Sequence, residues 1–90
     1  MDGLMMDYPL TISAMLRRTE SMFGHKEIVS RRADRTVERS NYALALGRAR
    51  RLASALERLG IGRGDRLATL CWNHLRHLEA YFGVPSSGAA

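Results

Sequence analysis

The feature that most constrains the fold is a run of apolar residues at helical spacing in the middle of the chain. From Tyr42 onward these residues recur every three or four positions, which is the spacing of one face of an α-helix. The members of this apolar stripe are Tyr42, Ala45, Leu46, Ala49, Leu52, Ala53, Leu56 and Leu59. Asn41 is placed to cap the helix, and Gly60 stands where a helix commonly ends in left-handed backbone. The sequence therefore predicts one long amphipathic helix, whose apolar stripe we expect a sheet to cover.

Two further elements are predicted before this helix. Ile12, Met15, Leu16, Met22 and Phe23 form a second one-sided helical pattern, with Thr11 as its N-cap and Gly24 as its stop. Segments 26–30 and 36–40 are rich in β-branched residues and predict a β-hairpin. Its turn chemistry is weak, because Asp34 is followed by Arg35 where a positive φ would favour Gly.

The last third of the chain predicts a strand and then a helix. Segment 66–72 is apolar at nearly every position, which is typical of a strand buried on both faces. Asn73 is placed to cap a helix carrying Leu75, Leu78 and Phe82, which we expect to end at Gly83 and Pro85. The predicted order is helix, hairpin, long helix, buried strand and helix, so the fold class is mixed α/β.

Length and charge narrow the functional classes. A chain of 90 residues allows one small domain. The net charge is +5 with a pI near 10.3, but the 14 basic residues are scattered among acids, so we expect no specific nucleic-acid binding. No apolar run is long enough to cross a bilayer, and the acidic start, residues 1–7, does not resemble a secretory signal. With Cys71 as the lone cysteine, these features predict a cytoplasmic protein without an internal disulfide.

Two clusters could carry chemistry, and both favour a structural interpretation. Gly60, Gly62 and Gly64 have neither the spacing nor the strand-to-helix position of a phosphate-binding loop, so they predict a turn. Cys71, His74 and His77 are spaced three apart, but Asn73 interrupts them and a fourth ligand is missing, which favours a small buried thiol and two locally bonded histidines. No serine lies in a nucleophile elbow. The sequence thus predicts no catalytic, cofactor-binding or metal-binding residue.

Several segments together resemble a known family. Gly64-Asp65-Arg66-Leu67-Ala68, with 59–61 before it and 72–74 after it, is similar to the amino-terminal part of AMP-forming acyl-CoA synthetases, in the adenylate-forming superfamily. Segments 76–85 and 6–11 are closer still to bacterial medium- and long-chain fatty acid-CoA ligases, and segments 23–31 and 42–43 also match. The resemblance covers essentially the whole chain, which makes it more specific than any short motif above.

The resemblance implies a two-step reaction. A fatty carboxylate attacks the α-phosphorus of Mg-ATP to give acyl-AMP, and coenzyme A then displaces AMP. In this family the phosphate-binding loop, the acyl pocket and the C-terminal domain lie beyond the position equivalent to Ala90, so no catalytic residue carries over and we expect no cofactor to be bound here. The resemblance divides the chain into an extended or disordered N-terminus, residues 1–10, and a partial AMP-binding N-terminal domain, residues 11–90.

Two functional hypotheses follow. The first is an N-terminal portion of a fatty acid-CoA ligase that is inactive by itself and whose partner is the remainder of the ligase domain. The second is a small basic module that docks on another protein or on nucleic acid. A chain with an incompletely covered apolar stripe should be marginally stable and should associate, so a homo-oligomer also remains open.

Overall fold

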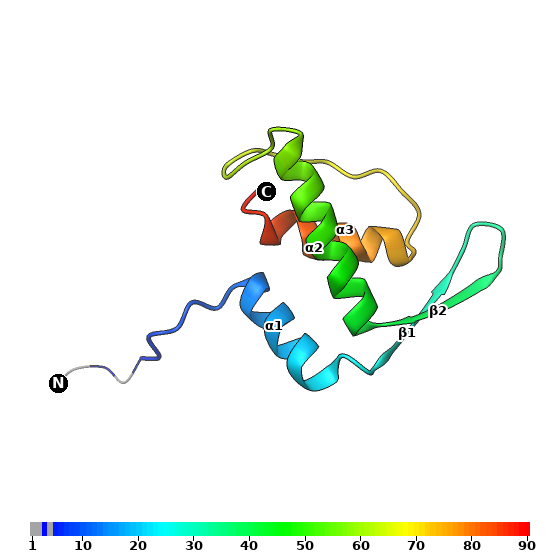
Figure 1. The fold of residues 1–90 in the computed structure, drawn as a ribbon, viewed down its shortest axis with the longest axis horizontal. Helices are drawn as coiled ribbons and strands as arrows, with labels where there is room; N and C mark the ends of the chain where they lie inside the picture. The colour runs from blue at the N-terminus through cyan, green and yellow to red at the C-terminus, as the bar shows by residue number, and fades with distance from the viewer. Residues whose placement is uncertain (1–2, 4) are drawn as a thin grey trace.

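The computed structural model describes residue 3 and residues 5–90. Three helices and one hairpin follow one another along the chain: α1 (Ile12–Phe23), β1 (Glu27–Arg31), β2 (Val37–Asn41), α2 (Tyr42–Arg58) and α3 (Leu75–Ser86). In Figure 1, α2 and α3 cross at the centre of the molecule, the hairpin projects to one side, and residues 5–11 extend away from the rest. The mixed helix-and-strand class predicted from the sequence is confirmed. No helix among the described residues is long and apolar enough to cross a membrane.

The core lies where α2 crosses α3. Its buried apolar residues include Ala45, Leu46, Ala49 and Leu56 from α2 and Leu75 from α3. These α2 residues all belong to the apolar stripe, so the predicted face is confirmed. The expected cover was wrong, because α2 packs mainly against the helix α3, and the only sheet among the described residues is the two-stranded hairpin.

Local capping signals set the starts of the first two helices. The side chain of Thr11 accepts a hydrogen bond from the amide of Ala14 at 3.1 Å, and Asn41 accepts one from Leu44 at 2.9 Å. Each bond satisfies an amide that has no partner within the helix. Gly60 follows α2 with a φ of 85°, as the sequence predicted for left-handed backbone.

The hairpin pairs β1 and β2 antiparallel, from Glu27 opposite Asn41 to Arg31 opposite Val37. Both strands lie one residue later than predicted. Arg35 has a φ of 71°, which confirms that the turn needs the left-handed backbone for which the sequence offers no glycine. The amide of Arg35 donates to the carbonyl of Arg32 at 2.9 Å and closes the turn.

The predicted buried strand at 66–72 is wrong. The segment contains no assigned strand, Leu70 is 103% exposed, and Trp72 is 76% exposed. Among the described residues the only sheet is the hairpin, so this segment has no neighbouring strand that would form a sheet with it. The side chains of Leu70 and Trp72 are therefore left uncovered.

The boundaries of α3 also differ from the prediction. His74, and not Asn73, caps the helix, because its Nδ1 accepts a hydrogen bond from the amide of Arg76 at 3.2 Å. The helix continues through Gly83 and Pro85 to Ser86. Pro85 lies in the last turn, where a missing amide forfeits a single helical bond. Gly83 is buried inside the helix at the crossing with α2 and does not terminate it.

Candidate functional site

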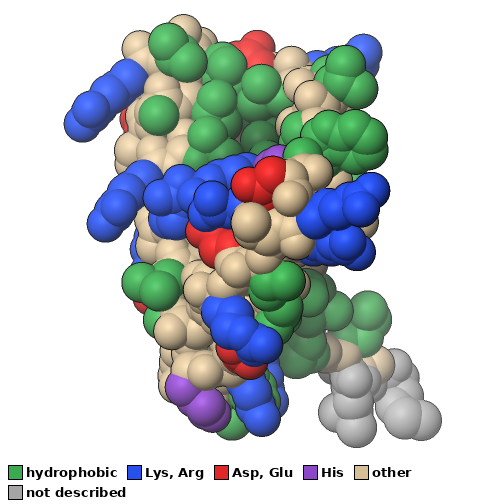
Figure 2. Space-filling model, turned by 90° about the vertical axis from the view of Figure 1, so that its right-hand side faces the viewer, with side chains coloured by type: hydrophobic (Ala, Val, Ile, Leu, Met, Phe, Trp, Pro, Cys, Tyr) green, Lys and Arg blue, Asp and Glu red, His purple; other side chains and the backbone are tan. Residues whose placement is uncertain are grey.

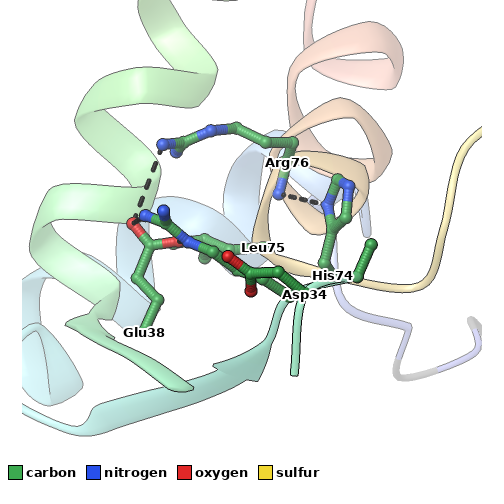
Figure 3. A pocket seen from close by; sticks show the side chains of 7 residues that line it. Asp34, Glu38, His74, Leu75 and Arg76 are labelled. Carbon is green, nitrogen blue, oxygen red and sulfur yellow. Dashed lines mark hydrogen bonds and ion pairs between the residues drawn. The ribbon is translucent and has the colours of Figure 1, made fainter. Parts of the chain in front are cut away.

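A cleft of about 420 Å³ lies between the hairpin and the start of α3, and we call it the hairpin–α3 cleft (Figure 3). It is lined by Arg32, Ala33, Asp34, Glu38, His74, Leu75 and Arg76. The charged groups come from the hairpin on one side and from the first turn of α3 on the other. The cleft is therefore the candidate site for acid, base or anion-binding chemistry.

Glu38 is the central acceptor of the hairpin–α3 cleft. Its carboxylate accepts from Nε of Arg32 at 3.2 Å, forms an ion pair with Nη2 of Arg32 at 3.1 Å, and lies 3.7 Å from Nη2 of Arg76. The hydrogen bond from Arg32 holds the pKa of Glu38 below its usual range, and Glu38 in turn raises the pKa of Arg32. Both groups are therefore charged at neutral pH, and each neutralises the other.

The other polar groups of the cleft are also engaged. Asp34 accepts from the hydroxyl of Thr36 at 2.6 Å and from its amide at 3.0 Å, and these bonds lower the pKa of Asp34. Nδ1 of His74 is used in capping α3. Figure 3 shows Asp34, Glu38 and Arg76 converging on the cleft, with Arg76 directed at Glu38. A general acid or base needs a free group beside a substrate, with its pKa suited to proton transfer. These side chains are instead held in ion pairs, in the hairpin turn or at the cap of α3.

The ion pairs continue from the cleft into the helix crossing. Glu79 in α3 is 5% exposed and accepts from Nε of Arg48 in α2 at 2.7 Å and from Nη1 of Arg76 at 3.1 Å. Because Arg76 reaches both Glu38 and Glu79, one chain of contacts joins β2, α3 and α2. Such a paired carboxylate fixes the relative position of three elements.

Ser30 supplies a further bond between the hairpin and α3. Its hydroxyl is buried and accepts from the amide of Leu75 at 2.8 Å, across 45 residues of sequence. No sign of this role for Ser30 is visible in the sequence, because no local pattern connects β1 with the start of α3. The polar groups of the hairpin–α3 cleft therefore hold the hairpin and α3 together through ion pairs and hydrogen bonds.

The glycine cluster forms a turn, as predicted. Gly60 and Gly64 have positive φ values of 85° and 87°. The amide of Gly62 donates to Oδ2 of Asp65 at 2.7 Å. An amide that already donates to a carboxylate of its own turn is not free to bind a phosphate.

Cys71 and the two histidines have different surroundings in the structure. Cys71 is exposed, so the expected buried thiol was wrong. His77 lies 2.9 Å from the hydroxyl of Thr69 through Nε2 and stacks on Tyr81 at a centroid distance of 4.7 Å, while His74 caps α3. Both histidines bond locally, as predicted. Across residue 3 and residues 5–90, no group of three or more His, Cys, Asp or Glu side chains is placed to hold a metal ion.

The basic residues do not form one block. In Figure 2, arginine side chains are spread over the visible face among apolar and acidic ones. Ion pairs with Glu20, Glu27, Glu38 and Glu79 engage several of them. A nucleic-acid surface usually presents a continuous basic stripe, so this distribution gives the basic-module hypothesis no support.

Comparisons with known proteins point to one family. Residues 16–90 match the family described as AMP-binding enzyme. The chain is 53% identical to a Long-chain-fatty-acid–CoA ligase of Thermus thermophilus, and this match covers 94% of the present chain. It is 43% identical to a 3-methylmercaptopropionyl-CoA ligase of Ruegeria lacuscaerulensis, with 96% of the present chain covered. A solved Mycobacterium tuberculosis fatty acyl CoA synthetase matches 89% of the chain with 30% identity and a TM-score of 0.69.

The chain spans about 16% of the length of each of these relatives. The sequence matches and the structural match nevertheless each cover most of the present chain. The mixed arrangement of helices and hairpin predicted as the start of an adenylate-forming domain is thereby confirmed. The chain belongs to the AMP-binding enzyme family.

Proposed function

We propose that the chain is the N-terminal scaffold of a fatty acid-CoA ligase. The observation that carries the proposal is the 53% identity to the Thermus thermophilus ligase over 94% of the chain. The TM-score of 0.69 to a fatty acyl CoA synthetase supports the same assignment from the fold. On this proposal residues 11–90 form part of the AMP-binding domain, residues 1–10 precede it, and the protein is cytoplasmic.

In the complete enzyme the proposed reaction has two steps. The carboxylate oxygen of a fatty acid bonds to the α-phosphorus of Mg-ATP and diphosphate leaves, which gives acyl-AMP. The thiol of coenzyme A then attacks the acyl carbon and AMP leaves. The relatives named above differ in acyl group, so the proposal commits to a carboxylic acid with an apolar chain and not to a chain length.

Within that reaction the present residues position other parts and do not act on substrate. The charged groups of the hairpin–α3 cleft are engaged with one another, and the glycine turn uses an amide on Asp65. We therefore propose that ATP, Mg²⁺ and coenzyme A are bound by residues outside this chain, and that the 90 residues by themselves form neither acyl-AMP nor acyl-CoA. The partner is the remainder of the ligase domain.

A chimera tests the proposed function. The segment of the Thermus thermophilus ligase that matches this chain is replaced by this chain, and acyl-CoA formation from palmitate, Mg-ATP and coenzyme A is measured. Because a scaffold that is about half identical should still support the site, we expect kcat/KM within about tenfold of the parent, a change of about 1.4 kcal/mol.

Two variants of the chimera control for folding. Leu46→Asp places a charge at a position that is 1% exposed and should abolish soluble enzyme, whereas Leu44→Asp changes a residue that is 60% exposed and should not. A chimera that folds with a native circular dichroism spectrum yet forms no acyl-CoA would refute the proposed function.

A further inference from the structure

An apolar groove of about 390 Å³ runs along α1, and we call it the α1 groove. One face of α1 forms most of it, and Tyr42 at the start of α2 and Phe82 in α3 complete it. The lining residues are Ile12, Met15, Leu16, Thr19, Phe23, Lys26, Tyr42 and Phe82. Its volume lies within the range of about 300 to 1,000 Å³ that is usual for small-molecule sites.

The chain leaves the α1 groove open. Ile12, Met15 and Phe23 are exposed although their side chains are apolar. Residues 5–11 extend away from the helices and do not fold back over them (Figure 1). Covering apolar area of this kind stabilises a complex, by about fourfold in affinity for each methylene group that the ligand buries. The α1 groove therefore favours a ligand with a hydrocarbon chain.

Of the described residues that line the α1 groove, only Lys26 is charged. Its amide donates to the carbonyl of Phe23 at 2.9 Å, and its carbonyl accepts from the amide of Tyr42 at 3.1 Å. The backbone of Lys26 is thus held between the end of α1 and the start of α2. The hydroxyl of Thr19, which also lines the groove, donates to the carbonyl of Met15 at 2.9 Å and is used within α1. The ammonium group of Lys26 is therefore the charged group available to a ligand.

No carboxylate neutralises Lys26 in the part of the chain that the structure describes. The acids closest in sequence are engaged with other bases, Glu27 with Arg39 at 2.8 Å and Glu20 with Arg50. No other described acid lies within ion-pair distance of the ammonium group. An exposed cation beside an apolar groove is complementary to a ligand whose hydrocarbon chain ends in an anion.

We propose that the α1 groove binds a single-chain amphipathic carboxylate, with its hydrocarbon chain along α1 and its carboxylate at the ammonium group of Lys26. From Ile12 to Phe23 the apolar face is about 16 Å long, because each helical residue adds about 1.5 Å, so it accommodates a chain of medium length. The proposed function assigns no ligand to these residues, and this site goes beyond it.

Methyl-resolved NMR of the 90-residue chain tests the site without an activity assay. Hexanoate, octanoate and decanoate are titrated below their micelle-forming concentrations, with decan-1-ol as the neutral comparison and decyltrimethylammonium as the cationic one. We expect the methyl signal of Met15 to shift saturably, while that of Met22, on the same helix but outside the groove, stays in place. Affinity should rise about fourfold for each added methylene group, and decanoate should bind more tightly than decyltrimethylammonium.

Two pairs of variants separate the contribution of the charge from that of the chain. Lys26→Gln should weaken decanoate binding about two- to fivefold, as expected for an exposed ion pair, and should leave decan-1-ol binding unchanged. Arg18→Gln removes an exposed cation of α1 that does not line the groove and should change neither. Met15→Gln should weaken the binding of both amphiphiles, whereas Met22→Gln should not. Met15 is 63% exposed and Met22 is 52% exposed, so neither change should unfold the chain.

Several outcomes would overturn the proposal. An unmoved Met15 signal in a chain whose α2 signals show it to be folded would remove the site. Equal shifts at Met15 and Met22, or shifts that begin only at the micelle-forming concentration, would assign the effect to nonspecific adsorption. Equal weakening in Lys26→Gln and Arg18→Gln would remove the role of Lys26. A Met15 signal that moves with protein concentration in the absence of amphiphile would assign the groove to a second copy of the chain.

Discussion

Gly83 of α3 lies directly against the carbonyl oxygen of Ala49 in α2, so that a Cβ on Gly83 would stand 2.9 Å from that oxygen and 3.1 Å from Cδ2 of Leu52. The two helices can approach this closely only because residue 83 has no side chain. The glycine is therefore retained inside a helix for packing, at a position where the sequence alone suggested a helix end.

Gly83→Ala should lower the free energy of unfolding by about 1 to 3 kcal/mol, because the added methyl group has to displace backbone of α2. Gly47→Ala is the matched control in α2, where an added Cβ would meet nothing within 4 Å. Gly47→Ala should raise stability by about 1 kcal/mol, since alanine has the higher helix propensity. Urea unfolding of both variants measures the difference, and a Gly83→Ala protein as stable as the wild type would contradict the close helix crossing.

Leu56→Ala should destabilise the chain by about 2 to 5 kcal/mol, because it leaves a cavity beneath α2. Leu56 is 8% exposed, whereas Leu59 in the same apolar stripe is 77% exposed. Leu59→Ala should therefore change stability by less than about 0.5 kcal/mol. Thermal unfolding followed by circular dichroism compares the two variants. Equal losses would show that the buried face of α2 has been misassigned.

Glu79→Gln should lower stability by about 2 to 3 kcal/mol. The change leaves Arg48 and Arg76 facing a neutral group at the helix crossing, and the usual loss for a broken buried pair is reduced here because both arginines are about half exposed. Glu27→Gln breaks the exposed pair with Arg39 and should change stability by less than about 1 kcal/mol. Chemical unfolding of both variants tests this ranking, and the reverse order would argue against Glu79 as the joint between α2 and α3.

Acid should weaken the hairpin–α3 cleft. The pKa of Glu38 is lowered in the folded state, chiefly by the hydrogen bond from Arg32, so the folded protein binds fewer protons than the unfolded one. The stabilisation is complete above the ordinary value of 4.5 and is lost as the pH falls through the depressed folded value. We expect the melting temperature to drop as the pH falls below 4.5, and to drop less steeply in Glu38→Gln. An identical pH profile for the two proteins would contradict the role of this ion pair.

The elements that the sequence predicted well are those whose causes are local. The caps at Thr11 and Asn41 and the apolar stripe of α2 depend on residues within a few positions of one another, and the structure confirms them. The family resemblance was likewise visible in short segments distributed along the chain.

The features that the sequence did not predict depend on distant partners. Whether segment 66–72 forms a buried strand depends on neighbouring strands, which the described residues do not provide. The bond from Leu75 to Ser30 joins residues 45 positions apart, and the packing of Gly83 on Ala49 is equally non-local. Neither contact leaves a spacing pattern that a single sequence could display.

The most direct test of the scaffold assignment is a titration of the 90-residue chain with Mg-ATP, followed by calorimetry and by amide chemical shifts. Because the polar groups described above are engaged with one another, we expect no saturable heat and no localised shift at millimolar nucleotide. Saturable binding of one Mg-ATP per chain with a Kd of about 10 μM, equivalent to roughly 7 kcal/mol of binding free energy, would contradict the scaffold assignment.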